Sequence, residues 1–372
     1  MPPKPIGLRL RCAGFHPCES VAQILFLFLQ RIQPLRHKKV LKTLQIGIIG
    51  LDTSHAVVFT DLLNSSTHPH HVPGGKVVVA FPGGSPDFEL SRSRVRGFTE
   101  KLRDQFGVRM LDSPEAVAEE CDALLLESVD GRAHPEQFRR IARFGKPVFV
   151  DKPFAVSSAE ARRMIALAKK SKVPLMSCSA LRYAEGLAQA LSDESKGAVI
   201  GADFYGPMAL ETTQPGLFWY GIHMVEMLFA TLGRGCQHVT ATTNRDHDLI
   251  VGVWSDGRIG TVRGNRKGNG VFGGVIHREK GSQHVDVYAN PKPYYASLLE
   301  QIMKMFETGK PPLDATETLE IVRLIEAANA SRATDKKMRF VASLPKNKPT
   351  ATREHPGSLI PYRFRVPPSV HN

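Results

Sequence analysis

Lys152 is the residue of this chain best placed to do chemistry. It stands in the run Asp151-Lys152-Pro153, directly after an apolar stretch, 147–150, that predicts a buried strand. Ligands of open parallel sheets bind at the carboxyl ends of the strands. A lysine that is desolvated or lies beside another cation becomes less basic and can take part in proton transfer. Pro153 predicts a rigid turn, with a cis bond as an option. The alternative is a surface lysine in an ordinary turn.

His223 and Glu226 form a second candidate pair, on a predicted helix that includes Gly221-Ile222-His223-Met224-Val225-Glu226. Residues three apart share a helix face, so an imidazole and a carboxylate would stand together as an acid/base pair. The alternative is a histidine satisfied within the core. Such a pair can also bind metal, but the sequence offers no convincing third ligand, and the histidine-rich loop 68–71 lacks a carboxylate or cysteine partner. We therefore expect no metal.

The stretch 44–63 predicts the opening unit of a dinucleotide-binding fold. An apolar strand at 46–49 ends at Gly50, a polar turn follows, and apolar spacing from residue 56 indicates a helix. The free N–H groups of such a helix suit a pyrophosphate. The expected cofactor contacts are Gly50, Leu51, Thr53, Ser54 and His55.

The turn departs from the G-x-G-x-x-G pattern, because Asp52 and His55 stand where glycines are expected. A carboxylate at 52 would repel phosphate unless it turned away or were neutralised. The next predicted strand, 76–81, lacks the terminal acid that usually binds the ribose of NAD. The choice between NAD and NADP therefore stays open, and so does an ordinary capped βαβ unit without a cofactor.

Alternating strands and helices between residues 44 and 180 predict an α/β fold with a Rossmann-type parallel sheet. After about residue 185 strands dominate, which predicts a C-terminal α+β domain with a large, mostly antiparallel sheet, closed by helices at 294–307 and 315–331. A flexible hairpin is expected at 264–274. The expected domains are a basic, poorly ordered extension (1–43), an NAD(P)-binding domain (44–180), a substrate and oligomerisation domain (181–342) and a Pro-rich basic tail (343–372).

The composition narrows the function classes. The 372 residues carry a net charge of +13, of which +7 falls in residues 1–43 and +4 in residues 343–372, so the body offers no basic surface for nucleic acid. The apolar run at 21–29 is too short to span a membrane. The five cysteines show no disulfide or metal spacing, and Cys121 and Cys178 beside apolar strands suggest core thiols in a reducing, cytoplasmic setting.

Three stretches together resemble the glucose–fructose oxidoreductase/inositol dehydrogenase (Gfo/Idh/MocA) family, over roughly residues 44–340. They are Gly145-Lys146-Pro147-Val148-Phe149-Val150-Asp151-Lys152-Pro153, the Gly221–Glu226 segment, and the closing GKPPLDATETLEIVRLIEAANAS. The resemblance implies a Rossmann domain followed by an α/β domain whose open sheet supports homo-oligomers. It implies NAD(P)-dependent oxidation or reduction of a sugar, polyol or related hydroxyl carbon. Lys152 would then bind the reacting hydroxyl and contact the nicotinamide side.

The chain departs from the family pattern at several positions. Inositol-dehydrogenase-like members carry an Asp where this chain has Trp219, so the proton relay is altered or absent. Trp219 instead offers an aromatic wall for a sugar, or it fills the core. Glu226 replaces the more usual Asp. Arg182 matches a family arginine that can meet the substrate or support the domain junction. After the strand 123–126 only His134 of the family's T-P-N-x-x-H is kept, and Ser128 can still contact the cofactor.

The sequence thus predicts an NAD(P)-dependent oxidoreductase for a small sugar or polyol, with Lys152 and His223 as catalytic residues. In this hypothesis Arg182, Trp219 and Glu226 bind the substrate. Two alternatives stay open. One is a non-redox ligand-binding or scaffold protein on the same fold, and the other is a glycosidase that uses tightly bound NAD.

Overall fold

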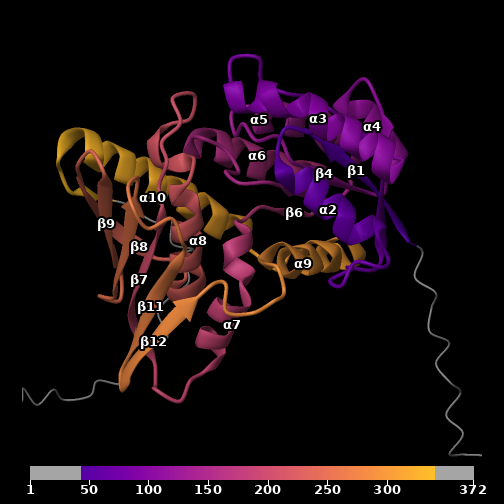
Figure 1. Ribbon diagram of the computed structural model, residues 1–372. Coiled ribbons are helices and arrows are strands. Elements are labelled where there is room, and N and C mark those ends of the chain that lie inside the picture. The colour runs from indigo at the N-terminus through magenta and orange to yellow at the C-terminus, as the bar shows by residue number, and fades with distance from the viewer. Residues whose placement is uncertain (1–42, 340–372) are drawn as a thin grey trace, which may run out of the picture. The chain divides into compact units, whose positions relative to one another are not determined.

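The structure is a computed structural model that describes residues 43–339, and these residues form two β-sheets with helices packed on them (Figure 1). The predicted basic segments, 1–43 and 343–372, lie outside the described range except for Thr43. Two of the five cysteines, Cys12 and Cys18, also lie outside it. The predicted fold class, a Rossmann-type sheet followed by a mostly antiparallel sheet, is confirmed.

The first sheet has six parallel strands in the order β3-β2-β1-β4-β5-β6. The order reverses between β1 and β4, and open α/β sheets bind their ligands at that crevice. Both strands are buried on both faces, as their continuous apolar sequences require. The strands are β1 (Leu44–Ile49), β2 (Gly75–Phe81), β3 (Arg109–Met110), β4 (Ala123–Leu126), β5 (Val148–Val150) and β6 (Leu175–Met176).

Helices connect these strands, and the predicted caps start two of them. Ser113 and Ser157 accept hydrogen bonds from the first turns of α4 and α6. Helix α3 places Arg92 and Arg96 on its surface, paired with Glu89 and Glu100 of the same helix. The helices are α2 (Ser54–Asn64), α3 (Glu89–Phe106), α4 (Pro114–Glu120), α5 (His134–Ile141), the short η1 (Ala142–Phe144) and α6 (Ser158–Ser171).

The second sheet has seven strands in the order β12-β11-β7-β10-β9-β8-β13. All neighbours are antiparallel except β7 and β10. The hairpin expected at 264–274 is wrong, because β7 lies between the strands that this loop joins. The strands are β7 (Val199–Pro207), β8 (Cys236–Thr243), β9 (His247–Trp254), β10 (Ile259–Asn265), β11 (Gly273–Arg278), β12 (Gly281–Asp286) and β13 (Met338–Arg339), of which the last two were not predicted.

Two helices, α8 (Gly221–Leu232) and α10 (Ala315–Thr334), pack on one face of the second sheet. Helix α9 (Tyr294–Thr308) instead returns to the first sheet and packs beside α2 (Figure 1). This return brings Tyr295 to the strand ends of the Rossmann half. The remaining short helices are η2 (Ala180–Tyr183), α7 (Glu185–Ser192) and η3 (Gly216–Phe218).

Across the described range, no helix is both long and apolar enough to cross a membrane. Cys121 and Cys178 are buried free thiols, as their apolar surroundings predicted.

Candidate active site

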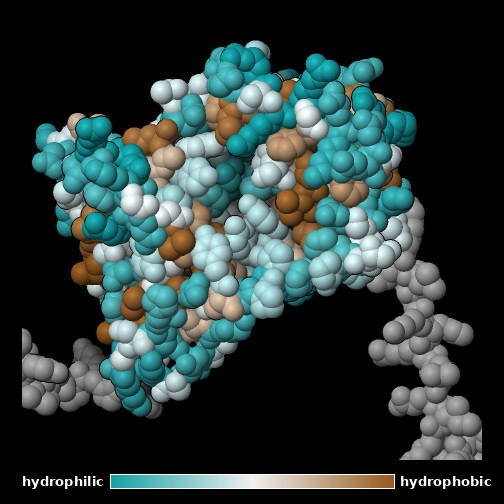
Figure 2. All heavy atoms as spheres, viewed as in Figure 1, coloured by the Kyte–Doolittle hydropathy of each residue, from teal (hydrophilic) through white to brown (hydrophobic). Residues whose placement is uncertain are grey.

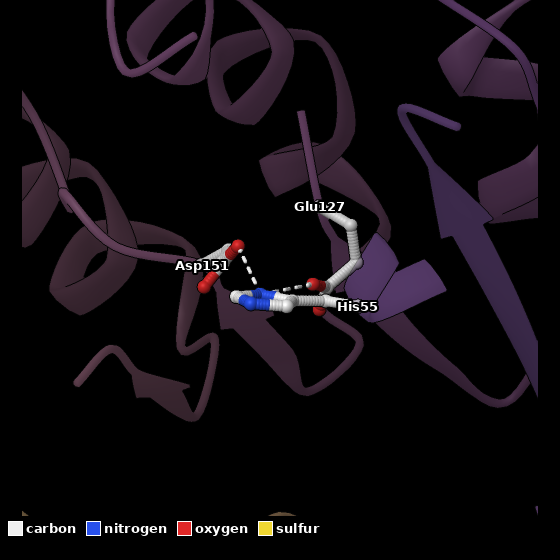
Figure 3. Close-up of side chains that lie close together, drawn as sticks. All are labelled: His55, Glu127 and Asp151. Atoms are coloured by element: carbon white, nitrogen blue, oxygen red, sulfur yellow. Dashed lines mark hydrogen bonds and ion pairs between the residues drawn. The ribbon is translucent and has the colours of Figure 1, made fainter. Parts of the chain in front are cut away.

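Four ionisable side chains meet where β1, β4 and β5 end. His55 stands in the first turn of α2, Glu127 follows β4, and Asp151 and Lys152 follow β5. The His55 Nδ1 atom lies 2.7 Å from the Asp151 Oδ2 atom and 4.0 Å from the Glu127 Oε2 atom (Figure 3). Parallel strands end at one edge of a sheet, so residues about 100 positions apart in sequence become neighbours there.

The Asp52 carboxylate, which could repel a phosphate, is turned into the protein. It is fully buried, accepts a hydrogen bond from the Ser91 hydroxyl at 2.6 Å and accepts another from the Val129 N–H at 2.9 Å. Burial raises its pKa, and the two hydrogen bonds only partly oppose that rise. Asp52 therefore ties the turn after β1 to α3 and to the loop after β4, and its charge does not face the helix N-terminus.

Gly50 meets a strict backbone requirement in the same turn. Its φ is +92°, and a Cβ at this position would collide with the backbone of Ser128. The N–H groups of Gly50 and Leu51 donate to the carbonyls of Phe81 and Pro82 at the end of β2. These two amides are therefore occupied, and the predicted cofactor contacts of Gly50 and Leu51 stay predictions.

The start of α2 still fits a dinucleotide pyrophosphate. Thr53 caps the helix, Ser54 is exposed, and the first N–H groups of a helix have no partner within the helix. The Ser128 hydroxyl is buried beside Gly50 and has no hydrogen-bond partner among the described residues. An orphaned hydroxyl at a ligand-binding sheet edge is suited to contact a bound group. The His55 ring, in contrast, points toward Asp151 and Tyr295.

Lys152 is almost fully enclosed, with 9% of its surface exposed. Burial lowers its pKa, and the charges of Asp151 and Glu127 partly offset that effect. Its Nζ atom stands over the Trp219 ring, 5.3 Å from the ring centre, at a distance that suits a cation–π contact. The Lys152–Pro153 bond is cis, as the sequence allowed.

The two carboxylates at the strand ends differ in their environments. Burial and the neighbouring charge of Asp151 raise the pKa of Glu127 well above its usual value. Burial alone would raise the pKa of Asp151 as well, but the contact with His55 and the charge of Lys152 lower it on balance. The pair thus holds one carboxyl that favours a proton and one that favours the ionised form.

His223 does not pair with Glu226, which corrects the predicted acid/base pair. The His223 Nδ1 atom lies 2.7 Å from the Ser179 hydroxyl. Burial, and then the positive charge of Lys152, lower the pKa of His223 well below its usual value, so the ring stands neutral within reach of the Lys152 charge. The charge of Lys152 thus acts on His223, and the predicted catalytic roles of the two residues stay predictions.

Glu226 and Arg182 form a buried ion pair instead. The Arg182 Nε atom donates to Glu226 at 2.8 Å, and the same guanidinium also contacts Glu317 of α10. The Arg182 side chain is 10% exposed and that of Glu226 is 2% exposed. Through these ion pairs, Arg182 and Glu226 hold η2, α8 and α10 together. Their predicted substrate contacts stay predictions.

Trp219 packs mainly into the protein. Its ring lies 5.4 Å from Phe88 and 5.9 Å from Tyr220, in edge-to-face contacts, and only 8% of the residue is exposed. Its open side carries the Lys152 ammonium. Trp219 therefore forms a wall of the lysine site, while its proposed stacking on a sugar stays a prediction.

Sequence reasoning missed Glu127, Asp151, Ser179 and Tyr295 as members of the site. The signal for the two acids was present, because each directly follows a buried parallel strand. Nothing in the local sequence marks Ser179 or Tyr295. Tyr295 reaches His55 only because α9 crosses back to the first sheet.

Known proteins can now be compared with this geometry. Residues 89–178 match the Gfo/Idh/MocA family, described as an oxidoreductase family with an NAD-binding Rossmann fold. The resemblance seen in the sequence is confirmed. We expected NAD or NADP as the cofactor, and the family is described as NAD-binding, which agrees with that expectation. No curated protein sequence gives a match.

Solved structures of dehydrogenases share the fold over most of the chain. A putative myo-inositol dehydrogenase from Sinorhizobium meliloti has 17% identity and a TM-score of 0.65, covering 80% of this chain and 100% of its own. The myo-inositol dehydrogenase from Lactobacillus casei, in complex with NAD(H) and myo-inositol, has 17% identity and a TM-score of 0.63, covering 82% and 99%. A probable dehydrogenase from Thermotoga maritima has 18% identity and a TM-score of 0.65, covering 79% and 98%. At such identities the likeness establishes the fold alone.

Proposed function

We propose that this protein is an NAD(P)-dependent oxidoreductase that acts on a hydroxyl or carbonyl carbon of a small sugar or polyol. The observation that carries the proposal is the placement of Lys152 at the carboxyl end of β5, where its side chain is enclosed and lies over the Trp219 ring. This is the ligand-binding edge of a sheet whose family is described as NAD-binding. The charge of Lys152 also contributes to the lowered pKa of His223. The myo-inositol found with the Lactobacillus casei enzyme supports the polyol class.

Lys152 holds the substrate oxygen in this proposal. Its ammonium group, flanked by Asp151 and the Trp219 ring, donates a hydrogen bond that orients the substrate oxygen. Its Nζ atom also exchanges a proton with that oxygen during the reaction. His223 is the second acid/base, and the Ser179 hydroxyl fixes its ring through Nδ1. The surrounding aromatic residues exclude water from the pair.

The nicotinamide group, when bound, supplies acceptance or donation of a hydride. The start of α2 and the Ser128 hydroxyl are the groups of this chain that would hold the dinucleotide. The inward orientation of Asp52 removes the objection that its charge would repel the pyrophosphate. Lys152 would also lie on the nicotinamide side of that cofactor.

Calorimetric titration of the full-length protein with NAD(H) and with NADP(H) tests the proposal. We expect micromolar binding of one cofactor, which corresponds to about −8 kcal/mol. Hydride transfer with a panel of polyols and sugars, followed at the nicotinamide absorbance, should then identify the substrate class.

The result that would overturn the proposal is a folded protein that binds no nicotinamide form, as a ligand-binding or scaffold protein would. Cofactor that stays bound through purification, together with cleavage of glycosides and no net redox turnover, would indicate the NAD-dependent glycosidase instead.

A further inference from the structure

His55, Glu127 and Asp151 are three side chains of types that bind metal ions, and they converge at one place (Figure 3). His55 comes from the first turn of α2, Glu127 from the end of β4 and Asp151 from the end of β5. One ligand atom from each lies within 4.8 Å of the other two. The exposed fractions of the His55, Glu127 and Asp151 side chains are 12%, 0% and 4%. The cluster is therefore enclosed, with His55 as its most accessible member.

Glu127 is the unusual member of this cluster. Both of its carboxylate oxygens are buried, and neither has a hydrogen-bond partner among the described residues. Its nearest basic atom in the cluster is the His55 Nδ1 atom at 4.0 Å, which is beyond hydrogen-bond distance. Buried carboxylates are normally paired, or they coordinate metal ions. A buried carboxyl group without a hydrogen-bond partner, facing a histidine and a second carboxylate, is therefore a candidate ligand for a cation.

The outer contacts hold His55 and Asp151 as metal ligands are held. The His55 Nε2 atom lies 3.1 Å from the Tyr295 hydroxyl, so this nitrogen can carry the proton and leave the Nδ1 lone pair for a metal ion. The Asp151 Oδ1 atom accepts the Lys152 backbone N–H at 2.7 Å, which leaves Oδ2 facing the cluster. Metal-binding histidines and carboxylates are typically oriented by such outer hydrogen bonds.

We propose that His55 Nδ1, one Glu127 oxygen and Asp151 Oδ2 bind one divalent transition-metal ion, of the zinc, manganese or iron(II) class. A nitrogen donor with two carboxylates suits these ions better than magnesium, which prefers oxygen ligands and retains its water. Three protein ligands leave at least one open position for water or a substrate oxygen, beside Lys152.

The local geometry requires only small adjustments. Ligands about 2.1 Å from a tetrahedral ion lie roughly 3.3 Å apart. The His55–Asp151 distance of 2.7 Å would open slightly, and the His55–Glu127 distance of 4.0 Å would close. The inference does not depend on the proposed redox activity, because metal binding is measured without nicotinamide or substrate.

Direct titration of the full-length protein tests the site. The protein is stripped with a chelator and then titrated with Zn²⁺ and Mn²⁺ by calorimetry, and with Co²⁺ by visible absorbance, which reports the coordination of the ion. We expect one ion per chain. Glu127→Gln should abolish this binding while circular dichroism and the thermal midpoint show a folded protein. Tyr295→Phe, which removes only the outer contact, should weaken the affinity by about 10- to 100-fold.

The loop histidines at 68, 70 and 71 provide the matched control, because they are a second cluster of described residues that could bind a metal ion adventitiously. His71 Nδ1 contacts the Leu62 carbonyl, and His68 accepts the His70 backbone N–H. The variant His68→Ala/His70→Ala/His71→Ala should bind the ion as the parent does. The inference is overturned if this triple variant loses the binding, if Glu127→Gln binds as tightly as the parent, or if the stripped parent binds no ion. If the stripped parent binds no ion, the cluster is only a network of charged side chains around His55.

Discussion

At the scale of single residues, Lys152 carries the proposed chemistry, and its surroundings make its role testable. Lys152→Met keeps the chain length and apolar stem but removes the ammonium that would hold the substrate oxygen. We expect kcat to fall by roughly 10²- to 10⁴-fold, the usual contribution of a positioned proton-transfer group. Steady-state kinetics with the substrate found in the screen measures this change. The exposed Lys169→Met should behave as the parent, and equal effects of the two variants would contradict the assignment.

The carboxyl group of Asp130 predicts how the free energy of unfolding changes with pH. Burial alone would raise the pKa of Asp130, but hydrogen bonds from Arg132 and Gln214 outweigh it and lower the pKa to about 2. A lowered pKa in the folded state stabilises the protein above the unfolded pKa of about 3.9, and this contribution is lost as the pH falls toward 2. At neutral pH it amounts to about 2 kcal/mol.

Denaturant unfolding of the parent and Asp130→Asn at a series of pH values tests this prediction. The variant should be less stable near pH 7, and the difference in unfolding free energy should shrink once the pH drops below about 4. Asp104→Asn, which removes an exposed partner of Arg103, is the control and should leave the free energy of unfolding nearly unchanged at every pH, because solvent screens an exposed ion pair. A difference that stays constant down to the lowest pH at which the parent folds would show that Asp130 acts through packing instead of charge.

At the scale of elements, the turn between β1 and α2 decides whether the fold can hold a dinucleotide. Gly50→Ala introduces a side chain at φ +92° and against the Ser128 backbone. We expect a loss of unfolding free energy of about 3 kcal/mol or more, because backbone strain and the collision add. Gly107→Ala, at φ +66° with open space around it, isolates the strain alone and should cost about 1 kcal/mol.

Urea unfolding of both glycine variants measures these costs, and titration with the cofactor measures the functional effect. Gly50→Ala should also weaken cofactor binding if it still folds, whereas Gly107→Ala should not. Equal costs for the two substitutions would mean that the close approach of Ser128 is easily relieved.

At the scale of the whole molecule, the second sheet leaves apolar side chains exposed. Ile200, Leu249 and Ile259 are 53%, 40% and 52% exposed, on β7, β9 and β10. Gly260, the next residue of β10, faces Leu228 and Leu232 of α8, so Ile259 points away from that helix. Figure 2 shows apolar patches on the side of the molecule where this sheet lies. We propose that this face joins copies of the chain in a homo-oligomer, as expected from the sequence.

Light scattering coupled to size exclusion tests the assembly. The parent should elute as a dimer or larger symmetric oligomer, and Ile259→Lys should shift the mass toward the monomer, because a symmetric interface would bury the new charge twice. Val271→Lys changes an equally exposed residue just outside the strands and should leave the mass unchanged. A parent that is monomeric at micromolar concentration would contradict the proposal.

Sequence alone determined most of the elements, because their signals are local, but it missed β12 and β13. Apolar runs bounded by glycine and caps located β1, β4 and β5, and the Asp-Lys-Pro turn after β5 singled out Lys152. The pairings at the site were decided by tertiary structure. Spacing suggested that His223 pairs with Glu226, yet in the fold each has a nearer partner from a distant segment, Ser179 and Arg182. His55, Glu127 and Asp151 meet only because parallel strands end at a common edge, and Tyr295 joins them only because α9 crosses back. Such contacts span up to 240 positions, and no local pattern of residue types encodes them.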